Sequence, residues 1–491
     1  MQPVQAAPAS PTAASPLPPA DPPLPVDTPV AAEPTPTAAP PNLVPTLTPP
    51  AVNTTPILYN AQAADSLPVL AVRFGVDPSE IQSAEPIPET AFLHPGQLLI
   101  IPRRLGNTTS PVKLMPDSEV VFSPSATGFD IAAFVDQAGG KMSSHREWLR
   151  TTGVDSGADV VLRVARENSI NPRLLLALIE YQSGWIYGQP ATQERIDYPL
   201  GKVDLREKGL YHQLVWAVNQ LSYGYYTYRE GRLTTIRLQD GTETRLAPDL
   251  NAGTAALQYY FAQLYDTGQW LAALDPQNGF PAVYERMFGN PWERAQAVEP
   301  LFPPGLAQPA LALPFLRNWQ WSFTGGPHGA WEHEGAFAAL DFAPGSTEPG
   351  CIKSNAWVTA AAAGLVVRSG PGVVVLDLDG DGHEQTGWVL LYLHIATEGR
   401  APAGTWLAAG EPLGHPSCEG GFSTGTHLHI ARKYNGEWIP AGGPLPFNLG
   451  GWVAQAGDAP YKGTLTRGEQ TITACTCASA ATRIIRNESD P

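Results

Sequence analysis

The sequence predicts a multidomain α+β protein. We expect a disordered Pro-rich N-terminus, a small βααβ unit, a mainly α segment and a mainly antiparallel-β segment. Three observations support this order. Seventeen prolines fall within the first 50 positions. Between about residues 125 and 300, apolar residues recur at three- and four-residue spacing, as on a helix face. Beyond about residue 315, short apolar runs such as 373–376 and 388–393 are joined by turn sequences, as in antiparallel sheets.

Residues 1–55 are predicted to be a Pro/Ala/Thr-rich disordered linker. No Lys or Arg occurs before Arg73, and apolar side chains are too sparse to build a core. The density of proline favours an extended, semi-stiff spacer. We expect this spacer to separate an envelope anchor from the folded body.

Residues 56–104 show the pattern of the βααβ unit. A strand is expected at 57–59, an amphipathic helix at 66–75 that ends at its glycine, and a second helix capped by Asp77. A turn and a strand follow within 94–101. These features predict a compact unit, and residues 105–125 are expected to form a linker after it.

This unit resembles the lysin-motif family, in Phe74-Gly75-Val76 and in the segment from Pro95 to Pro102. The resemblance implies binding to polymers of N-acetylglucosamine, such as the glycan of peptidoglycan. Many members have Asn where this chain has Ala84 or Glu85. A structural spacer is therefore the alternative.

Residues 126–304 are predicted to be mainly helical, with helices at Ala158–Asn168, Pro172–Gln182 and Asn251–Asp266. Segments 170–185 and 251–257 resemble two motifs of the lytic transglycosylases, which have a lysozyme-like fold. The resemblance places the catalytic glutamate of that family at the position of Gln182.

An amide such as that of Gln182 cannot donate and retrieve a proton as a carboxylic acid does. Glu180 lies about 200° away around the helix. We therefore expect a degenerate lysozyme-like domain that holds glycan or packs on its neighbour. Glycan cleavage through Glu180 is the alternative.

Two histidines, His427 and His429, occupy positions i and i+2 of an apolar run. On a strand, both side chains would project from the same face. Neutral imidazole is a good zinc ligand, so the pair indicates part of a metal site. The alternative is two surface histidines on an edge strand.

Further candidate ligands lie upstream. His328 follows Gly-Gly-Pro in an expected glycine-rich turn, and Asp341 lies between Leu and Phe, where an unpaired carboxylate would be costly to bury. His328, Asp341 and one histidine of the downstream pair would leave a fourth position for water, as in a catalytic zinc site. A further histidine, His394, ends the run 388–393. The chain has no His-Glu-x-x-His helix, so it has no thermolysin-type site.

The segment from about Phe315 to Trp438 resembles the lysostaphin-type zinc endopeptidases of bacterial cell walls, in particular the β-lytic protease and staphylolysin branch. The wide spacing between the first histidine and the aspartate is typical of that branch. Five motifs in the family's order support the resemblance: Gly-Gly-Pro-His328-Gly, Ala-Leu-Asp341-Phe, Leu-Tyr-Leu-His394, Gly-His-Pro-Ser-Cys418-Glu-Gly-Gly and Gly-Thr-His427-Leu-His429.

The resemblance implies that His328, Asp341 and His429 bind one zinc ion per chain. It implies that His394 and His427 handle the attacking water and the developing oxyanion. Zinc lowers the pKa of water and polarises a scissile carbonyl. A histidine must then take the proton, because no glutamate is placed to do so, and an ordinary pKa of about 6.5 suits that role. Which histidine does so stays open. The peptidase domain is expected at 305–460, with strands and a polar tail at 461–491.

Two alternatives concern metal binding. His333 lies in a polar loop and could replace His328 as the ligand, although its glutamate neighbours favour the charged, non-ligating form. The run Asp377-Leu-Asp379-Gly-Asp381 begins like a calcium loop, but position twelve is not the bidentate glutamate of an EF-hand. We expect a hairpin turn there, with bound calcium as the alternative.

The chain has four cysteines, which allow three pairings if all are oxidised. We expect a Cys351–Cys418 disulfide, which would fit an exported protein. Cys475-Thr-Cys477 could be a zinc half-site, but no second pair of cysteines accompanies it.

The net charge of −16 and pI near 5.0 argue against nucleic-acid binding. No apolar run reaches 18 residues, so no transmembrane segment is expected. The N-terminus lacks the basic start and apolar core of a signal peptide. We expect a secreted or envelope protein whose signal peptide lies outside this sequence.

The predicted function is that of a monomeric, zinc-dependent endopeptidase that acts on peptidoglycan, with the peptide and glycan of the wall as its partners. A non-catalytic wall-binding scaffold that activates other hydrolases is one alternative, and a lytic transglycosylase is the other.

Overall fold

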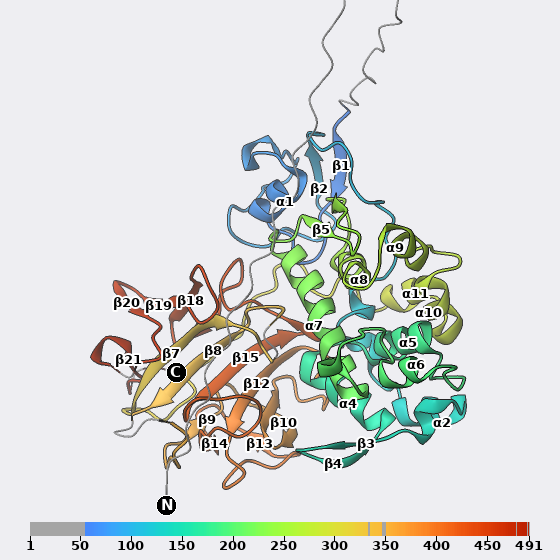
Figure 1. The fold of residues 1–491 in the computed structure, drawn as a ribbon. Helices are drawn as coiled ribbons and strands as arrows, with labels where there is room; N and C mark the ends of the chain where they lie inside the picture. The colour runs from blue at the N-terminus through green and yellow to red at the C-terminus, as the bar shows by residue number, and fades with distance from the viewer. Residues whose placement is uncertain (1–54, 332–333, 346–349, 478, 489, 491) are drawn as a thin grey trace, which may run out of the picture. The chain divides into compact units, whose positions relative to one another are not determined.

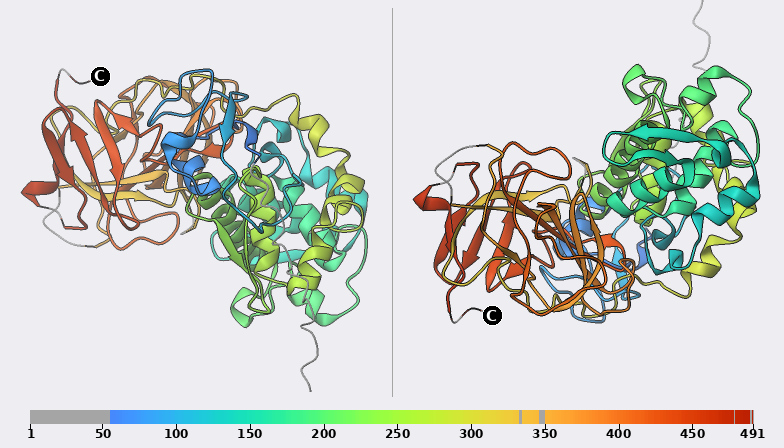
Figure 2. Two further views of the ribbon diagram at one scale, coloured as in Figure 1. Left: turned by 90° about the horizontal axis from the view of Figure 1, so that it is seen from above. Right: turned by 90° about the horizontal axis from the view of Figure 1, so that it is seen from below.

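The computed structural model describes residues 55–331, 334–345, 350–477, 479–488 and 490 (Figure 1). The predicted linker at 1–55 lies almost wholly outside these residues, and so does His333. Among the described residues, no helix is both long and apolar enough to cross a membrane. The two views of Figure 2 show the helices gathered in one group and the long strands in another.

The N-terminal unit pairs its first and last strands. Strand β1 (Ile57–Asn60) is antiparallel to β2 (Leu98–Ile101). Helix α1 (Leu67–Phe74) ends, as predicted, at a glycine in the left-handed conformation. The second predicted helix is only a single 3-10 turn, η1 (Pro78–Glu80), although its cap Asp77 is confirmed. The chain after Glu80 leaves the helix at once to pair with β2 through Gln82.

Buried polar contacts join this unit to the helical region. Arg73 forms a 2.9 Å ion pair with Asp65, and its guanidinium also donates to the carbonyl oxygen of Pro248. Gln62 donates to the carbonyl oxygen of Leu250 at 3.0 Å. The small unit is therefore held by specific hydrogen bonds as well as by chain connectivity.

The helical region follows the predicted apolar spacing. Helix α4 has a capping box formed by Ser156 and Asp159, and α5 begins with the cap Asn171 and a proline. Helix α8 ends four residues before the predicted end. The elements are η2 (Asp117–Glu119), η3 (Pro124–Ala126), α2 (Ile131–Ala138), α3 (Lys141–Ser144), β3 (Arg146–Leu149), β4 (Gly153–Ser156), α4 (Gly157–Asn168), α5 (Pro172–Ser183), α6 (Gln193–Asp197), η4 (Leu205–Glu207), α7 (Leu210–Arg229), β5 (Thr235–Arg237), β6 (Glu243–Arg245), α8 (Ala252–Ala262), α9 (Thr267–Ala273), α10 (Phe280–Phe288) and α11 (Pro291–Ala295).

The C-terminal region is built on a nine-stranded sheet with the order β13-β10-β11-β12-β15-β8-β7-β21, and β16 pairs with β15. All its pairings are antiparallel, as predicted. The elements are β7 (Gln320–His328), β8 (Ala339–Pro344), β9 (Val358–Thr359), β10 (Gly364–Gly370), β11 (Gly372–Asp377), β12 (Trp388–Ile395), β13 (Trp406–Leu407), β14 (Pro412–Gly414), β15 (Leu428–Tyr434), β16 (Glu437–Trp438), β17 (Asn448–Leu449), β18 (Trp452–Ala456), β19 (Gly463–Arg467), β20 (Gln470–Thr473), η5 (Ala480–Thr482) and β21 (Arg483–Ile485).

The predicted hairpin between β11 and β12 is confirmed; Asp377 ends β11, and Asp379 and Asp381 lie in the connection. One oxygen atom from each of these carboxylates lies within 4.8 Å of the others. The strands expected within 464–473 are β19 and β20, which belong to a separate four-stranded sheet with β17 and β18. Strand β21 instead joins the edge of the main sheet.

A buried charge cluster links the two large regions. Glu384, in the β11–β12 connection, accepts hydrogen bonds from Arg368 at 2.9 Å and Lys433 at 3.2 Å. Arg166 of α4 approaches the same carboxylate at 3.9 Å. Burial alone would raise the pKa of Glu384, but these cations hold it at about 2 instead of 4.5. The carboxylate is therefore charged at neutral pH, where it contributes to the stability of the fold.

We predict that Glu384→Gln lowers the free energy of unfolding by about 3 kcal/mol at neutral pH, because buried Lys433 loses its carboxylate. A folded-state pKa below the unfolded value gives stability that is present above pH 4.5 and lost as the pH falls toward 2. Urea unfolding of both proteins should show the difference shrinking over that range. Glu398→Gln, at an exposed ion pair with Lys353, should change little. An undiminished difference near pH 2 would contradict the assignment.

Candidate metal centre

The pairing of β8 with β15 brings the predicted ligands together. Asp341 and His429 are directly opposed across these two strands. Their neighbours Leu340, Phe342 and Ile430 point into the apolar core on one face of the sheet. Because side chains alternate along a strand, Asp341 and His429 share the opposite face. The apolar neighbours therefore fix the direction of both candidate ligands.

His328 reaches the same place from the end of β7. The expected glycine-rich turn is wrong: Gly325, Gly326 and Pro327 belong to the strand itself, which shifts register at this point. A Cβ atom on Gly325 would lie 2.4 Å from Oδ2 of Asp341. The glycine is needed because the aspartate packs directly against the backbone of β7.

Three ligand atoms converge here. His328 Nε2 is 3.2 Å and His429 Nδ1 is 3.3 Å from Oδ1 of Asp341, and the two nitrogens are 3.0 Å apart. All three side chains are buried. The set is the one predicted from the sequence, and its atoms are close enough to bind one ion.

The outer hydrogen bonds show where the imidazole protons lie. His328 Nδ1 is 2.8 Å from the carbonyl oxygen of Gly326, and His429 Nε2 is 2.9 Å from that of Ala330. A carbonyl oxygen can only accept, so these nitrogens carry the protons of the neutral rings. When both rings are neutral, the inner nitrogens present lone pairs to each other and to Asp341. This is the outer-shell arrangement that orients metal-binding histidines.

The charges also fit a cation. Burial alone would raise the pKa of Asp341, but His328 holds it well below its usual range, so the carboxylate is ionised. Its buried Oδ1 accepts no hydrogen bond from the described residues. Burial lowers the pKa of His328, yet Asp341 raises it overall. A proton can therefore compete with a metal for this site.

His394 lies beside the centre because of a β-bulge. On β12, Leu393 and Ile395 pair with β11, and His394 is the extra residue between them, with φ of +64°. Simple alternation would turn His394 toward the core face with Tyr392. The bulge turns it toward His427, with 4.4 Å between ring centroids.

Both of these histidines present Nε2 to the site. His394 Nδ1 donates to the carbonyl oxygen of Glu419 at 2.9 Å, and His427 Nδ1 donates to that of Gly425 at 2.8 Å. His427 Nε2 is 3.7 Å from Oδ1 of Asp341. Burial, then His427 and His429, lower the pKa of His394 to about 3. His394 is therefore neutral near pH 7.

Sequence reasoning missed Tyr461, whose ring stacks on His328 with 4.1 Å between centroids. Its φ is +66°. Its backbone N–H donates to the carbonyl oxygen of Pro327, and its carbonyl oxygen accepts from the N–H of Gly326. The side chain is 45% exposed, and burial followed by Asp341 raises its pKa. Its hydroxyl thus stays protonated and available as a donor. No local signal in the sequence marks it, because its role depends on a tertiary contact.

Similar proteins are found both by sequence and by structure. Residues 113–301 match the family described as "LasA, N-terminal domain". The chain is 29% identical over 310 residues to "Protease LasA" from two strains of Pseudomonas aeruginosa, which covers 57% of this chain and 68% of each relative. The chain is similar to the LasA proteases. This similarity supports the predicted peptidase.

Two solved structures also match. The M23 metalloprotease pseudoalterin is 23% identical, with a TM-score of 0.29, over 34% of this chain and 96% of that chain. Lysostaphin from Staphylococcus simulans is 15% identical, with a TM-score of 0.19, over 36% of this chain and 90% of that chain. The LasA match at 113–301 overlaps residues 126–304, the segment predicted to be lysozyme-like. The lysozyme-like assignment and the lysin-motif assignment both stay predictions.

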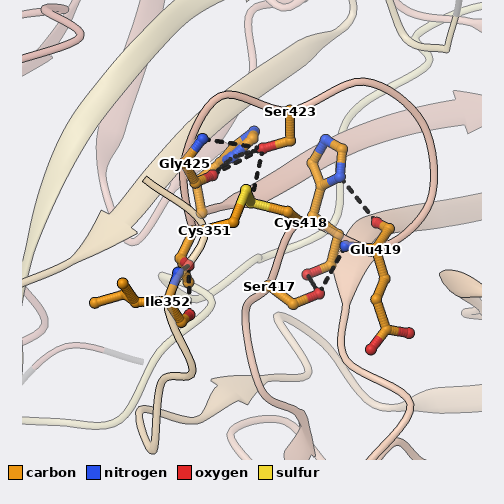
Figure 3. The surroundings of a disulfide bond; sticks show 10 residues. Cys351, Ile352, Ser417, Cys418, Glu419, Ser423 and Gly425 are labelled. Atoms are coloured by element: carbon orange, nitrogen blue, oxygen red, sulfur yellow. Dashed lines mark hydrogen bonds between the residues drawn. A yellow bond between two sulfur atoms is a disulfide. The ribbon is translucent and has the colours of Figure 1, made fainter. Parts of the chain in front are cut away.

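The cysteines of this LasA-like chain form two disulfides. The predicted Cys351–Cys418 bond is confirmed, and Figure 3 shows it with Ser417, Glu419 and Ser423 around it. Cys475 and Cys477 are bonded to each other. Their sulfur atoms are thus engaged in the structure, which removes the alternative of a zinc half-site.

Two other histidines, His383 and His415, and the two residues considered for glycan cleavage lie outside the metal centre. His383 is exposed, and His415 is held by the carbonyl oxygen of Ala356. Glu180 accepts hydrogen bonds from the backbone of the segment that follows α5, and Gln182 accepts one from Tyr265. Neither side chain contributes to the metal centre.

The choice of His328 over His333 can be tested by zinc titration. We predict that His328→Ala loses both zinc and activity, because Nε2 of His328 is one of the three converging atoms. His333→Ala should retain both within about tenfold, the range seen for changes outside the ligand set. Equilibrium dialysis of the two variants against zinc measures this directly, and the reverse pattern would show that His333 is the ligand.

Proposed function

We propose that this protein is a secreted zinc endopeptidase that hydrolyses peptide bonds of bacterial peptidoglycan. The observation that carries the proposal is the meeting of two imidazole nitrogens and one carboxylate oxygen without a hydrogen-bond partner in a buried site. Two neutral histidines and one carboxylate would hold one Zn²⁺ and leave a further position for water, the composition of catalytic rather than structural zinc sites.

His394 and His427 supply the proton transfer. A bound zinc ion would supply Lewis acidity toward a carbonyl and lower the pKa of water. His394 and His427 both present a proton-accepting Nε2, so either can remove the proton of the attacking water. General-base assistance of this kind contributes about 10²–10⁴-fold. No carboxylate other than Asp341 is grouped with these ligand atoms in the described residues, which supports a histidine base.

Tyr461 provides a hydrogen-bond donor. Neutral His394 and His427 cannot donate to the substrate, because their Nε2 atoms carry no proton. Its hydroxyl belongs to a ring stacked on His328, and the raised pKa keeps the proton on the oxygen. We propose that this hydroxyl donates to the oxyanion that forms on the substrate carbonyl. The protonated histidine then returns its proton to the leaving amine.

The wall as substrate is supported by the LasA match and by the two upstream segments that resemble glycan-binding families. We propose that 56–104 and 126–304 are accessory domains that hold glycan, and that the chain acts outside the cytoplasm. The confirmed disulfide is consistent with an exported protein. No observation favours glycan cleavage by 126–304, because backbone hydrogen bonds already engage the Glu180 carboxylate.

Hydrolysis of purified peptidoglycan tests the proposal. The zinc-loaded protein should clear a turbid suspension and release new amino termini, and a zinc chelator or His429→Ala should abolish both. Tyr461→Phe should keep zinc but lose about 10²-fold or more in rate, as for loss of one oxyanion donor. Trp406→Ala, at an exposed site on β13, serves as the control and should act like wild type.

Three outcomes would overturn this function. Hydrolysis by zinc-free protein at the full rate would exclude a zinc mechanism. Purified protein that binds far less than one equivalent of zinc would favour the non-catalytic scaffold. Release of anhydromuramyl products that Glu180→Gln abolishes would favour the transglycosylase.

A further inference from the structure

The Cys351–Cys418 disulfide joins two segments that each hold one of the non-ligand histidines. Figure 3 shows Cys418 between Ser417 and Glu419, with Cys351 next to Ile352. The bond closes a separation of 67 residues. Because its two ends lie in different loops, the bond fixes these loops to each other.

The Cys418 side of the bond holds His394. Ser417 donates both its backbone N–H, at 2.7 Å, and its hydroxyl, at 3.0 Å, to the carbonyl oxygen of His394. On the other side of Cys418, the carbonyl oxygen of Glu419 accepts the Nδ1 proton of His394. The two neighbours of Cys418 therefore fix both the bulged backbone and the ring of this histidine.

The Cys351 side holds the segment that leads to His427. The hydroxyl of Thr426 donates to the carbonyl oxygen of Ile352 at 2.6 Å and accepts from its N–H at 2.9 Å. The N–H of Thr426 also donates to the carbonyl oxygen of Gly350 at 3.1 Å. Thr426 directly precedes His427, so these bonds set the position from which His427 projects.

Ser423 connects the two sides. Its hydroxyl lies 3.4 Å from Sγ of Cys418, 2.8 Å from the carbonyl oxygen of Gly425 and 3.3 Å from Nδ1 of His427. The loop between has little packing of its own, since Phe422 is 85% exposed. The disulfide and these hydrogen bonds, rather than a buried core, must therefore order this loop.

The metal ligands depend on other segments. The outer nitrogens of His328 and His429 are held by the carbonyl oxygens of Gly326 and Ala330, which lie in β7 and the connection after it. Neither segment contains a residue of the disulfide. Loss of the bond should therefore disturb the two non-ligand histidines and leave the ligand set intact.

We propose that the Cys351–Cys418 disulfide is a positioning device for His394 and His427, which it aligns on the substrate side of the metal centre without contributing to metal binding. This role rests on the proposed function. The β-strand register orders the metal ligands, and a covalent cross-link between loops orders the proton-transfer pair. Cys351, Cys418, Ser423 and Thr426 are then positioning residues rather than catalytic ones.

The full chain with Cys351→Ala and Cys418→Ala tests this, with Cys475→Ala and Cys477→Ala as the matched control that removes the other disulfide. We expect the first double variant to keep one equivalent of zinc but to lose at least about tenfold in the rate at saturating peptidoglycan, while the half-saturating concentration stays within about threefold. The control should retain both values. Nitrogen-15 spectra should show broadened imidazole signals for His394 and His427 and unchanged signals for His328 and His429.

Two results would overturn the proposal: an unchanged rate in the first double variant, or a loss of zinc in proportion to the loss of rate. If that variant does not fold, Thr426→Val provides the second test. It should lower the rate several-fold with zinc retained, and Thr426→Ser, which keeps the hydroxyl, should restore it. The spectra distinguish the two proposals, because ordering of the histidine pair by the disulfide can be seen even if the wild-type protein does not hydrolyse peptidoglycan.

Discussion

The buried carboxylate of Asp341 is the constraint on which the C-terminal region depends. An ionised group with an unpaired oxygen is expensive in a protein interior unless a cation or a donor compensates it. Here the nearest groups are two imidazole nitrogens whose protons point outward to backbone carbonyls. A divalent cation at this centre would balance the charge of Asp341 and occupy its unpaired oxygen.

The sheet holds this arrangement in place. Cross-strand register opposes Asp341 to His429, and alternation sends their apolar neighbours to the core on the other face. The close approach at Gly325 brings β7 near enough for His328 to complete the set. The neighbouring histidines His394 and His427 are instead held by a bulge, by a disulfide and by the hydrogen bonds of the two loops that the disulfide joins.

Local sequence patterns indicated His328, Asp341 and one histidine of the pair 427 and 429, and the family resemblance selected His429. The disulfide followed from the family motif around Cys418. What could not be predicted depended on contacts between distant segments. Tyr461 reaches His328 only through a tertiary contact, and the bulge at His394 requires the register with β11. Glycines that suggested a turn before His328 instead permit close packing of a strand, which a sequence alone does not distinguish.

X-ray absorption at the zinc edge, on the full chain with one equivalent of zinc, identifies the atoms around the ion. We expect two imidazole nitrogens at about 2.0–2.1 Å and oxygen ligands at about 2.0–2.2 Å, with no sulfur. Asp341→Ala should change the oxygen shell and weaken binding. A sulfur shell at about 2.3 Å, or the absence of imidazole scattering, would show that zinc binds elsewhere and would contradict the assignment of His328, Asp341 and His429.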